Sequence, residues 1–186
     1  MSPTRVDEDQ RLMLAFQAGD RRAFETLFAR YSRPLVAFLG RMVPDRGRAE
    51  ELAQEVFVRV YRARERYEPR ARFSTWLFGI AHRLALNELA LAYRTRERPL
   101  EAARDLPGED PASLDDQLDA RRKIELLREA LVKLPERQRA ALVLRSEQGL
   151  GYEEIGEALG ASVASVKSLL HRARERLLAE MGDHRT

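Results

Sequence analysis

The sequence contains no cysteine. Without thiols the chain forms no disulfide, offers no thiolate nucleophile and supplies no cysteine-based zinc site. Its three histidines, His82, His171 and His184, lie too far apart in the sequence to form a set of metal ligands. We therefore expect neither a metal nor a cofactor.

Long apolar runs are also absent. No stretch approaches the ~18 consecutive apolar residues that a membrane span requires. The amino end, MSPTRVDEDQRLMLAF, is charged and lacks the apolar core of a signal peptide. We expect no membrane insertion and a cytoplasmic location.

Motifs for nucleotide or acid–base chemistry are missing as well. The stretch GLGYEEIG has glycines but not the G-x-G-x-x-G spacing, follows no predicted strand, and no Walker loop occurs elsewhere. Glu50 and Glu51 are adjacent on a predicted helix, where a solvated face explains them better than catalysis does. These absences indicate that the protein is not an enzyme.

The chain is rich in both charged and hydrophobic residues. Its 186 residues are 44% hydrophobic and 34% charged, a composition typical of folded, helix-rich proteins. This length suits one ordinary domain or two small ones. The net charge is only +3, from 33 basic and 30 acidic residues, but a small net charge is compatible with strongly basic patches.

Apolar residues recur at helical spacing in the first half, and no strand alternation appears. One predicted helix is capped by Asp20, and Pro34 should bend or divide it. A second is capped by Asp45, and a third begins with Ser74 or Thr75 as its N-cap. The apolar stripe of the second helix consists of Leu52, Ala53, Val56, Phe57, Val60 and Tyr61.

Between Arg94 and Gln117 the helical pattern fails. Prolines and Gly108 interrupt it, and six acidic residues make it negative: Glu101, Asp105, Glu109, Asp110, Asp115 and Asp116. We predict an all-α protein of two small helical domains joined by a flexible linker. The first domain covers residues 1–95, the linker 96–117, and the second domain, a helix-turn-helix, 118–186.

The stretch YEEIGEALGASVASVKSLLHRARERL, residues 152–178, has the helix-turn-helix pattern. This motif needs a small residue where its helices cross, a glycine in the turn and a buried β-branched residue in the second helix. Gly156, Gly160 and Val166 meet these needs, and Ser162 is a candidate cap. An amphipathic hairpin with a solvated basic face is the plainer interpretation. The basic face consists of Ser165, Lys167, Ser168, His171, Arg172, Arg174 and Arg176.

Four segments in order, LAQEVFVRVYR, FSTWLFGIAHRLALNEL, LPERQRAALVLRSEQGLGYEEIGEALG and SVKSLLHRARERL, resemble the extracytoplasmic-function (ECF) group of the sigma-70 family. The resemblance covers nearly the whole chain. It implies a promoter-specificity subunit of bacterial RNA polymerase that serves a stress or signal regulon. The first domain would bind core polymerase and the −10 element, and the second domain the −35 element.

The resemblance also implies site residues. The segment ELAQE corresponds to the part that docks on the β′ clamp helices, which implicates Glu51, Gln54, Glu55 and Arg59 in core-polymerase binding. The segment YEPRARFSTWL matches the part that holds the non-template strand, although a lone tryptophan at helical spacing is more often core. The −10 candidates are Arg70, Arg72, Phe73, Ser74, Trp76, Arg83 and Asn87. The −35 candidates are Ser165, Lys167, Ser168, His171, Arg172 and Arg174.

Some positions depart from the family pattern, so the resemblance alone does not establish a contact there. Arg83, Asn87 and Ala90 stand where asparagine, aspartate and often arginine are expected, and Leu169 stands where arginine is common. The resemblance implies further partners: the β flap, promoter DNA and an anti-sigma protein. For the acidic linker it adds a second interpretation, a nucleic-acid mimic near the RNA exit path.

Three rival interpretations are open. A stand-alone helix-turn-helix regulator would bind an operator without core polymerase. A helical adaptor or an anti-sigma partner would show no salt-dependent affinity for DNA. An enzyme is the weakest rival, since the motifs that carry catalysis are missing.

Overall fold

A computed structural model of the chain describes residues 7–95 and 126–183, and within these ranges all regular structure is helical. The all-α prediction is therefore confirmed. The predicted linker 96–117, the expected domain start at residue 118 and His184 lie outside the described residues. Below, the first half means residues 7–95 and the second half residues 126–183.

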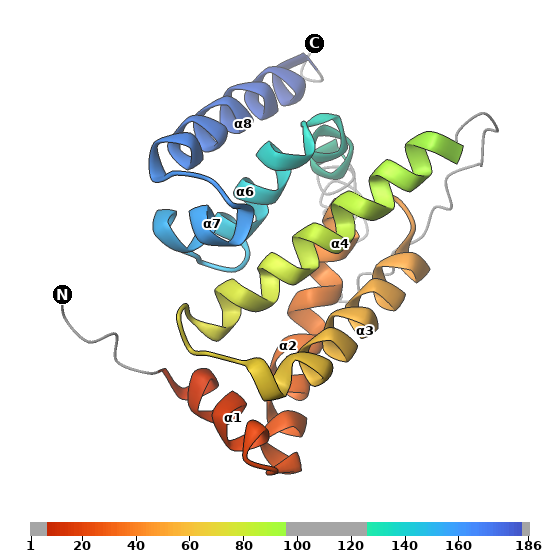
Figure 1. Cartoon of the computed structure of the whole chain (residues 1–186). Helices are drawn as coiled ribbons and strands as arrows, with labels where there is room; N and C mark the ends of the chain where they lie inside the picture. The colour runs from red at the N-terminus through yellow and green to blue at the C-terminus, as the bar shows by residue number, and fades with distance from the viewer. Residues whose placement is uncertain (1–6, 96–125, 184–186) are drawn as a thin grey trace, which may run out of the picture.

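The order of the helices follows Figure 1. The first half contains α1 (Glu8–Gln17), α2 (Arg21–Met42), α3 (Arg46–Ala63), a short 3-10 helix η1 (Arg64–Arg66) and α4 (Phe73–Thr95). The second half contains a helical segment over residues 126–133, then α6 (Glu136–Ser146), α7 (Tyr152–Leu159) and α8 (Val163–Asp183).

The helix starts were mostly predictable. Asp20 accepts a hydrogen bond from the Arg22 backbone N–H at 2.9 Å, and Asp45 accepts one from Arg48 at 2.6 Å, so both predicted caps are confirmed. The prediction of Ser74 or Thr75 as the cap of α4 is wrong, because this helix already begins at Phe73.

Pro34 does not divide α2, which runs as a single helix through it. Proline removes one backbone hydrogen bond and crowds the preceding turn. The four side chains that follow it on the inner face are fully buried, and their packing offsets this cost. They are Leu35, Phe38, Leu39 and Met42.

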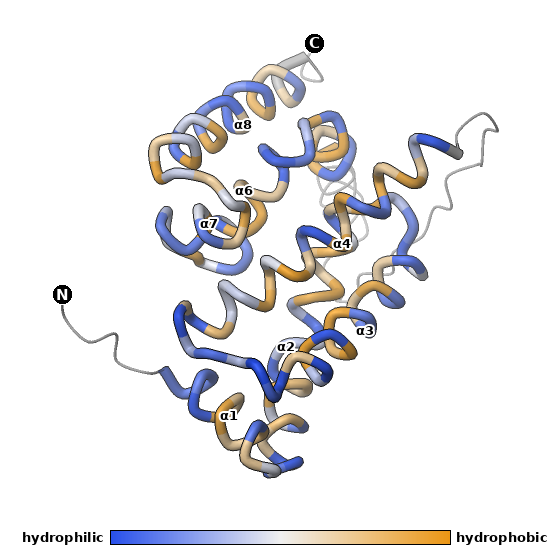
Figure 2. The backbone as a smooth tube through the Cα atoms, viewed as in Figure 1, coloured by the Kyte–Doolittle hydropathy of each residue, from blue (hydrophilic) through white to orange (hydrophobic). Residues whose placement is uncertain are grey.

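The core of the first half lies between α2, α3 and α4, with α1 packed across one end of α2. Figure 2 shows apolar residues along the facing sides of these helices and a hydrophilic segment between α3 and α4. The stripe predicted for α3 is buried from Leu52 to Val60. Tyr61 is the exception, because its ring is 45% exposed at the edge of the aromatic side chains Phe16 and Phe24.

The predicted helix-turn-helix is present in α7 and α8. Gly160 adopts a left-handed conformation with φ of 60°, which glycine tolerates best. Val166 is completely buried. Ser162 accepts a hydrogen bond from the Ser165 backbone N–H at 3.2 Å, as its predicted capping role requires. A Cβ on Gly156 would lie only 2.6 Å from the carbonyl oxygen of Ala161, so this position admits no side chain.

We predict that Gly156→Ala lowers the free energy of unfolding by about 1–3 kcal/mol, because the new methyl group meets rigid backbone. Gly40→Ala is the matched control. Gly40 is also helical, but a Cβ there meets nothing within 4 Å, so this change should raise stability by about 0.5–1 kcal/mol. Urea unfolding followed by circular dichroism measures both. Equal midpoints for Gly156→Ala and the native chain would contradict the packing described here.

Candidate functional site

The outward face of α3 carries the candidates for core-polymerase binding. Gln54 and Glu51 are exposed, and Glu55 forms an i,i+4 ion pair with Arg59 at 3.0 Å. Glu51 is held by Arg48 at 2.6 Å. Two apolar side chains on the same helix are exposed as well, Val58 by 39% and Tyr61 by 45%. A polar, partly acidic face with apolar contacts in it suits a protein partner, because its carboxylates would repel phosphates.

The −10 candidates lie on the segment before α4 and along α4. Arg70, Arg72, Arg83 and Asn87 are exposed, and Ser74 is half-buried. Phe73 requires a correction, because its side chain is completely buried and cannot stack on a base in this structure.

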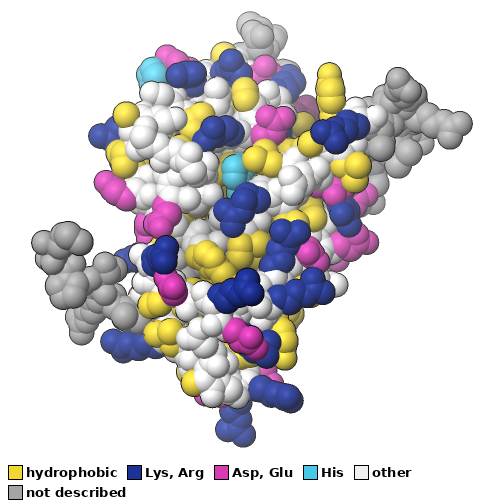
Figure 3. All heavy atoms as spheres, viewed as in Figure 1, with side chains coloured by type: hydrophobic (Ala, Val, Ile, Leu, Met, Phe, Trp, Pro, Cys, Tyr) yellow, Lys and Arg dark blue, Asp and Glu magenta, His cyan; other side chains and the backbone are white. Residues whose placement is uncertain are grey.

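Trp76 is half-buried and belongs partly to the core. Its ring lies 5.1 Å from the ring of Tyr67 and 5.8 Å from that of Phe73. It also lines a pocket of about 470 Å³ with Tyr67, Arg66 and Arg70. Aromatic faces beside guanidinium groups are the chemistry that holds an unpaired base and its phosphate. Figure 3 shows basic side chains gathered around an apolar patch over α4 and the segment before it.

The −35 candidates all lie on the exposed side of α8, and none is buried. They are Ser165, Lys167, Ser168, His171, Arg172 and Arg174. His171 is paired with Glu175 at 3.3 Å, and the Ser168 hydroxyl donates to the Ala164 carbonyl of its own helix at 3.1 Å. Leu169 is half-buried against the core, as its apolar character predicts. α8 therefore presents a cationic, solvent-facing surface.

The two halves pack against each other, α7 on α4 and α6 on α2, and their buried side chains form one continuous cluster. We call this the closed arrangement. A Cβ on Gly79 would lie 3.4 Å from the carbonyl oxygen of Ala158, so α4 and α7 approach closely. Arg41 pairs with Glu147 at 3.0 Å, and Arg72 pairs with Glu154 at 3.2 Å. Arg72, a candidate for −10 binding, is thus paired with Glu154, a carboxylate of the helix-turn-helix.

Arg139 is a residue of this interface that sequence reasoning missed. Only 7% of it is exposed, and its guanidinium donates to Met42 O at 3.0 Å in the first half. It also donates to Val132 O at 2.8 Å and Leu134 O at 3.1 Å in the second half. The signal was present, because Arg139 stands four residues before Val143 on the inner face of α6.

His82 is a second buried polar residue, and the sequence analysis did not predict its burial. It is 3% exposed, and its Nε2 atom has no hydrogen-bond partner among the described residues. Burial, followed by the positive charges of Arg137 and Arg83, lowers the pKa of His82 to about 4. The imidazole is therefore neutral in the folded chain at neutral pH.

The low pKa of His82 predicts that acid destabilises the fold. The unfolded chain takes up a proton at this residue near pH 6.5, whereas the folded chain does so only near pH 4. Stability is therefore complete above about pH 6.5 and falls as the pH drops toward 4, by about 3 kcal/mol from this residue.

Urea unfolding at a series of pH values measures this loss. His82→Gln should show a flatter pH profile than the native chain. Carboxylates also titrate in this range, so the difference between the profiles isolates the share of His82. Parallel profiles for the native chain and His82→Gln would show that its proton uptake does not differ between the two states.

No helix in the described part of the chain combines the length and apolarity needed to cross a membrane. Within residues 7–95 and 126–183 no group of three or more His, Asp or Glu side chains is placed to hold a metal ion.

Comparison with known proteins covers both halves. Sigma-70 region 2 matches residues 27–98, and Sigma-70, region 4 matches residues 124–177. The chain is 37% identical over 176 residues to RNA polymerase sigma factor CarQ of Myxococcus xanthus, with 92% of this chain and 96% of CarQ covered. It is 33% identical over 174 residues to the ECF RNA polymerase sigma-E factor of Escherichia coli K12, with 90% and 91% covered.

Among solved structures, CnrH in complex with the cytosolic domain of CnrY is similar over nearly its full length. The TM-score is 0.72 at 26% sequence identity, and the match covers 95% of this chain and 99% of the CnrH chain. The likeness therefore extends through both halves rather than to one of them alone.

Proposed function

Because the chain belongs to the extracytoplasmic-function group of the sigma-70 family, and is thus an RNA polymerase sigma factor rather than a stand-alone regulator, we propose how its two halves divide the work. Residues 1–95 bind core polymerase and the −10 element, and residues 118–186 bind the −35 element. The observation that carries this proposal is the match of region 2 and region 4 to the two halves in order.

Core polymerase docks on the exposed face of α3. Gln54 and Glu55 lie at its centre, and the exposed Val58 supplies apolar area. The β′ clamp helices are the proposed partner on this face. The ion pair of Glu55 with Arg59 is solvent-exposed and weakly held, so both groups are available for exchange with partner charges.

The −10 segment captures opened bases rather than melting the duplex. Separating about ten base-pair steps at about 1.4 kcal/mol each costs on the order of 14 kcal/mol, whereas stacking two or three bases returns roughly 2–9 kcal/mol. Polymerase must therefore supply the rest. Arg70 and the Trp76 ring line the pocket for a base, and Arg72 is placed for a phosphate once Glu154 releases it.

The closed arrangement cannot serve both promoter elements at once. Elements centred 25 positions apart are separated by about 85 Å along B-form DNA, at about 3.4 Å per position. Here α7 of the helix-turn-helix touches α4. Glu154 and Glu157 also stand beside the −10 arginines, where they repel an incoming phosphate. The halves must separate for promoter binding.

A regulatory partner could control the separation of the two halves. CnrH, one of the similar solved structures, is bound to the cytosolic domain of CnrY. We propose that an anti-sigma protein likewise binds this chain and keeps it from polymerase.

Run-off transcription with core polymerase on genomic fragments tests the proposal, and the purified chain should direct at least one defined start. The double variant Gln54→Ala with Glu55→Ala should lose core polymerase in a pull-down and lose run-off product by roughly tenfold or more. Glu25→Ala, an exposed acidic residue of α2 outside this face, is the control and should behave as the native chain. No start site with any fragment, in the absence of inhibitor, would reject the function.

The α8 surface gives a separate prediction. Lys167→Ala with Arg172→Ala should remove the −35 footprint of the holoenzyme and reduce the salt dependence of binding by about two units of log–log slope. Arg11→Ala with Arg22→Ala removes the same charge from exposed positions of the first half and should leave the footprint intact. An unchanged footprint in the first double variant would place the DNA on another surface.

A further inference from the structure

No step of the proposed function uses α1, yet this helix holds the connection between α3 and α4, residues 64–72. The connection carries four arginines: Arg64, Arg66, Arg70 and Arg72. Residues 67–72 form neither helix nor strand. Within the connection, the Tyr67 N–H donates to Arg64 O at 3.3 Å and the Arg70 N–H to Glu68 O at 2.8 Å. The other carbonyls need partners from outside it.

Gln17, at the end of α1, holds the first part of the connection. Its side-chain amide nitrogen donates to the backbone carbonyls of Arg64 at 2.9 Å, Glu65 at 3.2 Å and Tyr67 at 3.2 Å. An amide nitrogen has only two N–H groups, so one of them is shared between two carbonyls. Three carbonyls directed at one nitrogen fix the direction in which the chain leaves η1.

Gln10, in the first turn of α1, holds the second part. Its side chain is 1% exposed, and its amide nitrogen donates to Ala71 O at 2.6 Å and to Pro69 O at 3.3 Å. Its amide oxygen accepts from the Asp7 backbone N–H at 2.7 Å in the capping box of α1. Because the oxygen is used at the start of the helix, the nitrogen must face the connection.

The helix that carries the two glutamines is itself fixed to α2. The ring of Phe16 stacks on that of Phe24 with their centroids 4.7 Å apart, and the Tyr31 hydroxyl donates to Asp9 at 2.5 Å. The glutamines are seven residues apart on α1, which is about 10 Å along the helix. The connection is therefore attached at two separate points to a support that cannot easily shift.

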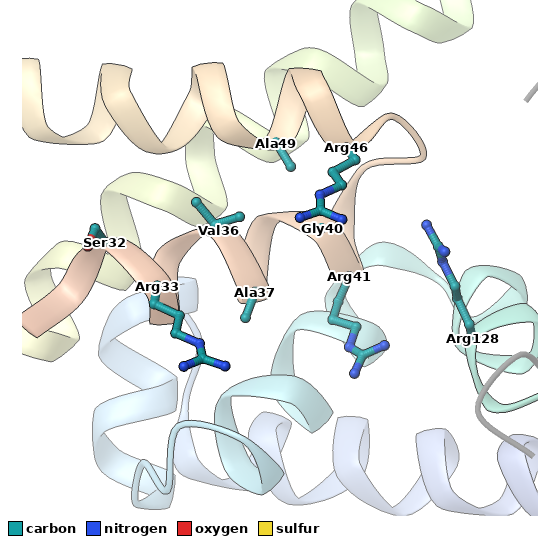
Figure 4. A pocket seen from close by; sticks show the side chains of 9 residues that line it. All are labelled: Ser32, Arg33, Val36, Ala37, Gly40, Arg41, Arg46, Ala49 and Arg128. Carbon is teal, nitrogen blue, oxygen red and sulfur yellow. The ribbon is translucent and has the colours of Figure 1, made fainter. Parts of the chain in front are cut away.

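Side chains of the same connection form a wall of the pocket at Trp76. Arg66 and Arg70 line this pocket together with the indole ring. The larger pocket, which Arg33 and Arg128 border over an apolar floor, has no aromatic ring on which a base could stack (Figure 4). Of these two pockets, only the one at Trp76 suits an opened base. Through the backbone of the connection, the glutamines set where its guanidinium groups stand relative to the ring.

We propose that Gln10 and Gln17 are positioning residues for recognition of the −10 element, because they hold the connection in the form that receives the opened strand. This proposal rests on the proposed function, since only then does the connection bind DNA. A connection that is already ordered loses little freedom on binding, and a fixed wall discriminates between bases that a mobile one accepts alike. Loss of the glutamines should therefore alter the choice of −10 sequence and spare the −35 element.

Gln10→Met with Gln17→Met removes both amide donors and keeps uncharged side chains of similar length. Met13→Ala is the control, because it removes a completely buried side chain from the same helix and leaves both amides in place. Urea unfolding identifies the conditions under which each variant is folded. Gln17→Met alone, at a half-buried position, gives the same test if the double variant does not fold.

Holoenzyme formed from core polymerase and each variant selects sequences from a pool of linear DNA in which both promoter elements are randomised. The native chain should enrich one −35 and one −10 sequence. The double glutamine variant should keep the −35 preference, while its preference among bases at the −10 element falls roughly tenfold. Met13→Ala should keep both preferences.

Hydrogen exchange of the free chain, followed by mass spectrometry, tests the support without polymerase or DNA. Peptides from residues 64–72 should exchange roughly tenfold faster in the double glutamine variant, because the connection opens more often when it loses its supports. Peptides from α6 and α8 should exchange as in the native chain. Unchanged exchange in residues 64–72 would overturn the proposal.

The selection separates the two levels of the argument. If native holoenzyme enriches no sequence, the proposed function fails, whatever the exchange shows. If it enriches a −10 sequence and the double glutamine variant does so equally well, the role of the glutamines is rejected alone. An equal loss at both promoter elements would reject it too, since general destabilisation produces that result. The same −10 loss in Met13→Ala would assign the effect to the packing of α1 instead of the amides.

Discussion

The buried guanidinium of Arg139 joins the two halves of this chain. It has no carboxylate partner among the described residues. Its two terminal nitrogens donate instead to backbone carbonyls at the ends of two helices, α2 in the first half and the segment 126–133 in the second, while its Nε atom has no hydrogen-bond partner there. Burial lowers the pKa of Arg139, and the partial negative charge of the helix C-termini offsets part of this desolvation cost. This contact sets α6 against α2. Because α7 follows α6 through a short turn, it also brings the helix-turn-helix onto α4.

Under the proposed function, this docking makes Glu154 compete with nucleic acid for Arg72. Glu154 of α7 caps its own helix by accepting from the Gly151 backbone N–H at 2.6 Å, and it also pairs with Arg72. A phosphate that approaches Arg72 must therefore displace the Glu154 carboxylate. After displacement this carboxylate still caps α7 through the Gly151 N–H. Loss of the Arg72–Glu154 ion pair therefore costs the second half little. Separation of the halves is opposed mainly by the loss of their shared apolar contact and of the hydrogen bonds of Arg139.

Arginine serves different purposes in this protein, and exposure decides which. Arg139 is buried and structural. Arg172 on α8 is exposed, and we propose that it binds DNA. Arg33 and Arg128 border an apolar pocket. A count of basic residues does not separate these uses, since they differ in what surrounds the group.

The sequence by itself determined the helical class, the caps at Asp20, Asp45 and Ser162, and the helix-turn-helix glycines, because each depends on neighbours within a few residues. It also placed the exposed faces of α3 and α8, since helical periodicity assigns one side to the core. Only the tertiary structure decided that Phe73 is core, that Arg139 and His82 are buried, and that Arg72 meets Glu154. These outcomes depend on which surfaces of the two halves come together, and no local pattern encodes a contact between residues separated by eighty positions of chain.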